Sequence, residues 1–174
     1  MDDATSTKTT TPGASARKPA RPKLGPFAHV SMPCRDLAEG KRFYGDVLGG
    51  QIRVDTPTFA AFMFGDVEVG IGNQGCTFIE PGNEYPHFAF YCDAETLVAM
   101  KDWLTACHIP TSNLWTRHGK ETLMFFRDPS GNMIELYCKG GYAGAERLPK
   151  GPPRGHGTAV NVDELRYETW RLPG

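Results

Sequence analysis

Three side chains in this sequence, His29, His87 and Glu135, are of the types that bind a transition metal. Each lies in a run with the period-2 alternation of a β-strand, on the face opposite a set of bulky apolar residues. Two neutral imidazoles and one carboxylate form a ligand set that suits Fe(II), Mn(II), Zn(II) or Ni(II) and leaves positions open for water or substrate. Taken singly, each histidine is more often a structural residue, so the case for a metal depends on how the fold places them.

The chain contains the same β-α-β-β-β pattern twice, over about 27–72 and 86–138. The openings FAHVSMPCRD and YPHFAFYCD carry His29 and His87 at equivalent third positions. Each opening ends in an aspartate that can cap the following helix, predicted over 37–48 and 94–107. This duplication predicts an α+β fold in which paired βαβββ modules form curved, open, barrel-like mixed sheets around a shared cavity.

The stretch 125–138 is predicted to form a strand, a tight turn and a second strand. Its Asp-Pro-Ser-Gly segment has the residues that a turn requires, and Glu135 falls in the middle of the following strand. A carboxylate among bulky neighbours costs free energy unless it is paired, although an edge strand with Glu135 in water is the alternative. Further strands are predicted at 51–54, 59–64, 67–71, 112–116 and 121–127.

Composition divides the chain into three parts. Residues 1–25 have almost no bulky apolar side chain and are predicted to be a disordered tail. Residues 26–140 hold the two modules, which a Gly-, Pro- and Asn-rich linker joins near 72–85. Residues 141–174 are predicted to be an extended arm, and Tyr167 and Trp170 favour its docking on its own domain or on a partner.

The bulk properties exclude several classes of protein. A chain of 174 residues with 40% apolar content, 22% charged content and net charge −1 offers no electrostatic case for binding nucleic acid or an anionic membrane. No apolar run has the roughly 18–20 residues of a membrane span, and the N-terminus lacks the apolar region of a secretory signal. The five cysteines lack CxxC spacing and are interpreted as free thiols, which favours the cytoplasm.

The motifs described above resemble those of the vicinal oxygen chelate superfamily, the glyoxalase, bleomycin-resistance and extradiol-dioxygenase group. The resemblance covers about residues 26–140 and is most specific in the run DPSGNMIELY and in its spacing to both histidines. It implies one divalent metal per site, held by His29, His87 and Glu135, and a small substrate that chelates the metal through adjacent oxygens. In members this short, two chains commonly complete each site together, so a homodimer is expected.

The first module bears on the branch of the superfamily. Aligning GDVEV with GNMIE places Val69 opposite Glu135 and predicts that Glu68 faces the other way. The chain then offers three protein ligands, whereas glyoxalase I and the acyl-CoA epimerases of the family use four. Three ligands match the extradiol dioxygenases and the fosfomycin-resistance transferases.

A second cue is the pair Arg117-His118, which resembles the extradiol dioxygenases, where such a histidine assists the bound catecholate and oxygen. His118 is therefore a predicted catalytic residue, with Arg117 beside it. The alternative is that both lie in an exposed turn. Both three-ligand branches usually carry a tyrosine ten residues before the glutamate, and this chain has Phe125 there.

The resemblance favours an Fe(II) dioxygenase of the extradiol type that uses O₂. The alternatives are a lyase, isomerase or thiol transferase with Zn, Ni or Mn, and a non-catalytic protein that sequesters a ligand. Tyr91 and Tyr137 share faces with His87 and Glu135, and they are predicted either to contact the substrate or to pack at the rim.

Overall fold

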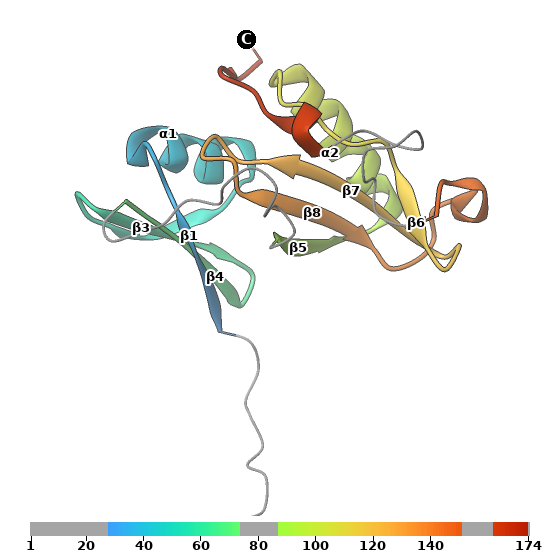
Figure 1. The fold of residues 1–174 in the computed structure, drawn as a ribbon. Helices are drawn as coiled ribbons and strands as arrows, with labels where there is room; N and C mark the ends of the chain where they lie inside the picture. Colours follow the sequence, from blue (N-terminus) through green and yellow to red (C-terminus); the bar gives the residue numbers. More distant parts are fainter. Residues whose placement is uncertain (1–27, 74–86, 151–161, 174) are drawn as a thin grey trace, which may run out of the picture.

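The computed structural model describes residues 28–73, 87–150 and 162–173, and the predicted N-terminal tail lies outside them. The first module, residues 28–73, and the second module, residues 87–138, each form a four-stranded sheet with a helix (Figure 1). Neither sheet is closed, which confirms the predicted α+β class. The elements are β1 (His29–Pro33), α1 (Leu37–Arg42), η1 (Phe43–Val47), β2 (Gln51–Asp55), β3 (Phe59–Phe64), β4 (Val67–Gly72), β5 (His87–Cys92), α2 (Ala94–Ala106), β6 (Trp115–Arg117), β7 (Glu121–Arg127), β8 (Met133–Cys138), η2 (Ala145–Arg147) and η3 (Val162–Leu165).

The two sheets have the same topology. Their strand orders are β1-β4-β3-β2 and β5-β8-β7-β6. In each sheet the first strand pairs in parallel with the last, and the other neighbours are antiparallel. The parallel pair needs a crossover connection, which includes the helix in both modules. The strand that opens each module therefore lies beside the strand that ends it.

Both predicted helix caps are present. The side chain of Asp36 accepts a hydrogen bond from the backbone N–H of Glu39 at 3.0 Å, and Asp93 accepts one from Thr96 at 2.7 Å. The first helix differs from a regular α-helix because its second half, η1, is a π-helix. That half carries Phe43 and Tyr44, both fully buried.

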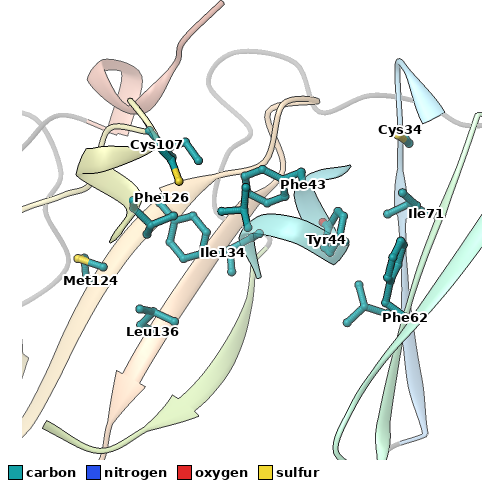
Figure 2. Packing of buried hydrophobic residues seen from close by; sticks show 14 of the residues in the cluster. Cys34, Phe43, Tyr44, Phe62, Ile71, Cys107, Met124, Phe126, Ile134 and Leu136 are labelled. Atoms are coloured by element: carbon teal, nitrogen blue, oxygen red, sulfur yellow. The ribbon is translucent and has the colours of Figure 1, made fainter. Parts of the chain in front are cut away.

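The main core lies between the modules. Figure 2 shows Phe43 and Tyr44 between the second sheet, which contributes Phe126 and Ile134, and the first sheet, which contributes Phe62 and Ile71. The ring of Tyr44 stacks on Phe62 with centroids 5.9 Å apart. The helix of the first module is thus the layer that joins the two sheets.

The predicted turn between β7 and β8 also joins the modules. One carboxylate oxygen of Asp128 accepts hydrogen bonds from the backbone N–H groups of Ser130 and Asn132 at 3.0 and 2.8 Å. The other oxygen accepts from the Tyr44 hydroxyl at 3.0 Å and from the Asn132 amide at 2.7 Å. That amide also donates to the carbonyl of Pro33 at 2.8 Å. The turn is therefore tied to both β1 and η1 of the first module.

The C-terminal segment, residues 162–173, docks on its own chain. The Tyr167 hydroxyl donates to the Arg127 carbonyl at 2.9 Å, and the Trp170 indole donates to Glu39 at 2.9 Å. Figure 1 shows this segment in red between the ends of α1 and α2. Of the two destinations expected for the arm, these contacts show the first, its own domain.

Two further expectations concern the described part of the chain. Four cysteines there are free thiols, Cys34, Cys92, Cys107 and Cys138, and Cys76 lies outside it. None of the helices in these ranges is long and apolar enough to cross a membrane.

The turn predicts a specific dependence of stability on pH. Burial raises the pKa of Asp128 from 3.8 to about 6, against the opposing effect of its hydrogen bonds. The folded protein therefore holds this proton more tightly than the unfolded chain, and the resulting stabilisation is lost as pH rises from about 4 to 6. The free energy of unfolding of the unaltered protein should fall by about 3 kcal/mol across that pH range. We expect Asp128→Asn, which keeps the shape but cannot ionise, not to show this fall. Urea unfolding at pH 4, 5, 6 and 7 measures this, with the exposed Asp55→Asn as control. An unchanged pH dependence in Asp128→Asn would contradict the assignment.

Candidate metal site

His87 and Glu135 meet on one face of the second sheet, which we call the site face. In the parallel pair of β5 and β8, Ala89 is the register partner of Glu135, so both side chains lie on the same face. His87 is two residues before Ala89 and therefore also lies on that face. The Nε2 atom of His87 is 3.5 Å from Oε2 of Glu135. The Glu135 side chain is only 4% exposed, and that of His87 is 21% exposed. The sequence prediction that these two side chains converge is consistent with this geometry.

The pair lies in a pocket of about 430 Å³. Its lining residues are His87, Ala89, Tyr91, Arg117, Glu135 and Tyr137. The guanidinium of Arg117 lies 5.8 Å from the ring centroid of Tyr137 and 5.9 Å from that of Trp115. Tyr91 and Tyr137 pack edge to face with centroids 5.3 Å apart. The pocket therefore has one cationic wall and one aromatic wall around a carboxylate and an imidazole.

The Glu135 carboxylate is incompletely satisfied. Its Oε2 atom is buried and has no hydrogen-bond partner among the described residues. A buried carboxylate oxygen without a partner costs free energy, and native structures keep such atoms chiefly where a ligand or a function uses them. The indole Nε1 of Trp115 and Oε2 of Glu121 are likewise buried without a partner in the described ranges. All three residues lie on the site face, by the register of β6, β7 and β8.

Tyr137 stays protonated near neutral pH. Its pKa is raised, first by loss of solvent and then by the Glu121 carboxylate, while Arg117 acts in the opposite direction. The Tyr137 hydroxyl is thus available as a hydrogen-bond donor at the mouth of the pocket.

His29 is not part of this group within one chain. It is exposed, on β1 of the first sheet. In the part of the chain that the structure describes, no three His, Cys, Asp or Glu side chains are placed to hold a metal ion together. The structure therefore brings together two of the three predicted ligands and leaves the third on the other module.

One prediction about the first module is wrong. His29 is the register partner of Glu68 on the parallel strand β4, so Glu68 shares the face of His29. The same register makes Gly70 the counterpart of Glu135, in place of Val69, which is buried in the core. The one-residue error arose because the turn sequences were aligned without the strand pairing. The count of three ligands is unaffected, since Gly70 has no side chain and Glu68 pairs with Arg53 at 2.9 Å.

The predicted catalytic pair is divided between two environments. Arg117 lines the pocket, whereas His118 lies in the exposed turn between β6 and β7 with a φ of 61°. Phe125 is the register partner of Glu135, and its ring packs edge to face on His87 with centroids 5.3 Å apart. A catalytic role for His118 stays a prediction.

Two polar residues of the site face, Trp115 and Glu121, were not predicted. The alternation of β7 contains the signal for Glu121, because Phe125 faces Glu135 and Glu121 is an even number of residues before it. The sequence gives no comparable signal for Trp115, which lies at the start of a strand of three residues.

The fold and this pocket agree with a match to a family model. The model of the Glyoxalase/Bleomycin resistance protein/Dioxygenase superfamily matches residues 27–136. The chain belongs to this superfamily.

Relatives and solved structures support the same assignment. The chain is 27% identical over 111 residues to the metallothiol transferase FosB of Staphylococcus epidermidis, covering 63% of this chain and 78% of the relative. Lactoylglutathione lyase from Agrobacterium tumefaciens superposes with a TM-score of 0.56 at 23% identity, covering 67% of this chain and 95% of that one. Fosfomycin resistance protein FosX from Mesorhizobium loti gives 0.55 at 19% identity, covering 67% and 93%. These structural likenesses establish the fold.

The residues of the pocket fit a divalent metal. Donor atoms that bind one ion at about 2.0–2.2 Å each are separated by roughly 3 Å, and His87 Nε2 and Glu135 Oε2 are 3.5 Å apart. The buried, unpartnered oxygen of Glu135 has the chemistry of such a ligand. The nature of the donors suits zinc, manganese, nickel or iron and does not select among them.

The unpartnered carboxylate predicts opposite effects on stability and on metal binding. We expect Glu135→Gln to stabilise the metal-free protein by about 1 kcal/mol, because the buried oxygen that accepts no hydrogen bond becomes part of a neutral amide of the same shape. The same change should weaken metal binding at least tenfold. Thermal unfolding with and without EDTA and titration with Mn²⁺ measure the two effects, with Glu95→Gln at an exposed position of α2 as control. Destabilisation of the metal-free protein would show that a partner within the fold satisfies Glu135.

Proposed function

We propose that the protein is a metal-dependent enzyme whose site consists of His87 and Glu135 of one chain and His29 of a second copy. The observation that supports this most directly is the buried carboxylate oxygen of Glu135 beside the imidazole of His87. An imidazole from outside the chain would complete the set of two histidines and one carboxylate.

A second copy is the natural source of the third ligand. His29 and Ser31 are exposed on β1, and Ala89 and Tyr91 are exposed on β5, in each case on the face that carries the histidine of that sheet. Each chain thus presents one face on which His29 lies beside a carboxylate already paired with Arg53, and one face on which His87 lies beside the Glu135 carboxylate. A two-fold dimer that apposes unlike faces would form two identical sites.

Mixing two defective variants tests the sharing. His29→Ala and Glu135→Gln should each fail to bind Mn²⁺ tightly. When the two are unfolded together and refolded, a mixed dimer contains one site with His29 from one chain and His87 and Glu135 from the other. We expect each mixed dimer to bind one Mn²⁺ ion, which is half an ion per chain. Titration measures this after the mixed dimer has been purified through two different affinity tags.

A site built within one chain predicts no recovery in the mixed dimer. A control mixture of His87→Ala with Glu135→Gln, which damage the same half, should recover nothing under either arrangement. Recovery in that control would contradict the assignment of both residues to one half of the site.

The pocket supports chemistry on a small substrate with an oxygen-bearing, anionic group. Arg117 supplies the positive charge, and the hydroxyls of Tyr91 and Tyr137 can donate hydrogen bonds to substrate oxygens. A metal bound there supplies Lewis-acid activation of those oxygens. Among the described residues no cysteine lines the pocket, and in this proposal the thiol nucleophile comes from a second substrate.

Thiol transfer is the reaction that we place first. The curated relatives at 25–27% identity, from two Staphylococcus species, are metallothiol transferases. We expect the Mn²⁺-loaded protein to consume a small thiol in the presence of an epoxide phosphonate such as fosfomycin. Arg117→Ala should raise KM for the anionic substrate about tenfold with little effect on kcat, and Arg117→Lys should recover part of the loss. Equal KM values for Arg117→Ala and the unaltered protein would remove Arg117 from substrate binding.

Ring cleavage by an Fe(II) dioxygenase is the second candidate, and the Arg117-His118 pair favours it. His118 would hold or pass a proton at the rim, beside the cation that lines the pocket. Anaerobic loading with Fe(II), followed by catechols and an oxygen electrode, tests this reaction. O₂ uptake that His118→Ala reduces at least tenfold would establish it over thiol transfer, and no uptake with a broad panel would exclude it.

A further inference from the structure

The C-terminal segment places one apolar side chain on the site face. Leu165, at the end of η3, is fully buried. It belongs to a small cluster with Trp115, Leu123, Phe125 and Met133, and Tyr137 packs against the same cluster. This cluster is separate from the main core, which lies on the other side of the sheet. The superfamily match ends at residue 136, so Leu165 comes from outside the matched region.

Leu165 shares a cluster with a residue that packs on one of the candidate metal ligands. Phe125 belongs to the same cluster as Leu165, and its ring also packs on the imidazole of His87 at 5.3 Å. Trp115 is the next member, with its ring centroid 5.5 Å from that of Phe125 and its indole Nε1 unpartnered. Tyr137 packs against this cluster and also lines the pocket, so the cluster adjoins the pocket that carries Glu135 and Arg117.

The segment is anchored on both sides of the molecule. Beyond Leu165, the Tyr167 hydroxyl bonds the Arg127 carbonyl, and the Trp170 ring packs on Phe43 with centroids 6.0 Å apart. The backbone N–H of Arg171 donates to the Cys107 carbonyl at 3.1 Å. Contacts to β7, to η1 and to the C-cap of α2 thus fix the segment that carries Leu165.

We infer that Leu165 is a specificity-determining residue that limits the site to compact substrates. The polar end takes the oxygen-bearing group, and the Leu165 side chain fills the space that a bulky apolar substituent would need. The inference rests on the proposed function for the metal end of the pocket, and it adds the class of substrate: small, oxygen-rich and without a large apolar group. Shortening Leu165 should open the site toward Phe125 and Trp115.

The experiment compares two chelating ligands that differ only in apolar bulk. Catechol and 4-tert-butylcatechol are titrated anaerobically into the Mn²⁺-loaded, full-length protein. We expect the unaltered protein to prefer catechol and Leu165→Ala to shift the affinity ratio at least tenfold toward 4-tert-butylcatechol. Leu165→Met, which refills the space, should keep the original preference, as should Leu172→Ala in an exposed part of the same segment. If Leu165→Ala loses its cooperative thermal transition, Leu165→Val should give a shift of at least threefold.

A metal-free measurement separates this inference from the proposed function. Without metal, an anilinonaphthalene sulfonate should bind folded Leu165→Ala at one saturable site and should not bind Leu172→Ala. Adding Arg117→Ala should weaken that binding at least fivefold, because the sulfonate would lie at the cationic wall. If Mn²⁺ fails to bind but this probe binds as expected, the metal assignment is wrong and the role of Leu165 in limiting the site is retained. Two outcomes would overturn the role of Leu165. One is that Mn²⁺ binds but Leu165→Ala has the same affinity ratio for the two catechols as the unaltered protein. The other is that the protein binds neither Mn²⁺ nor, as Leu165→Ala, the sulfonate probe.

Discussion

The structure depends on the buried carboxylate of Asp128. Both of its oxygens accept two hydrogen bonds, and the donors come from its own turn and from Tyr44 of the first module. Since the hydroxyl of Tyr44 is fully buried in the main core, the turn cannot move without exposing polar atoms or opening that core. One carboxylate thus fixes both the β7–β8 connection and the position of the second sheet against the first.

Strand pairing then decides which side chains meet. The parallel pairing of β5 with β8 brings His87 to Glu135, although 47 residues lie between them in the sequence. The equivalent pairing of β1 with β4 brings His29 beside Glu68, where Arg53 neutralises the carboxylate. The duplicated modules therefore share a framework but have different chemistry. One offers an imidazole with a carboxylate that pairs with Arg53, and the other offers an imidazole with a carboxylate whose Oε2 atom accepts no hydrogen bond among the described residues. The proposed dimer would use this asymmetry by apposing the two unlike faces.

Much of this framework could be predicted from the sequence, because local signals were strong. The caps at Asp36 and Asp93, the Asp-Pro-Ser-Gly turn and the alternation around Glu135 each act over a few residues, and the structure has all of them. The face of Glu68 could not be obtained in the same way, since register is a non-local property and an error of one residue reverses every side chain. The separation of His29 from His87 depends on how the modules pack, which no local pattern contains. The docking of Leu165 is equally remote, because its partners lie 30 to 50 positions earlier in the chain.

Two buried carboxylates differ in how completely they are hydrogen-bonded, and the difference distinguishes a structural residue from a candidate site residue. Asp128 and Glu135 are both about 3% exposed, and Glu135 follows Asp128 by seven positions in the sequence. Asp128 has four donors, which is enough to hold a turn in place, whereas Oε2 of Glu135 has none among the described residues. A fold that leaves the second carboxylate unsatisfied gives up stability at that position, and such a loss is retained where an external ligand restores it. The network at Asp128 fixes the turn from which the strand of Glu135 begins, and it thereby fixes the position of the unsatisfied oxygen.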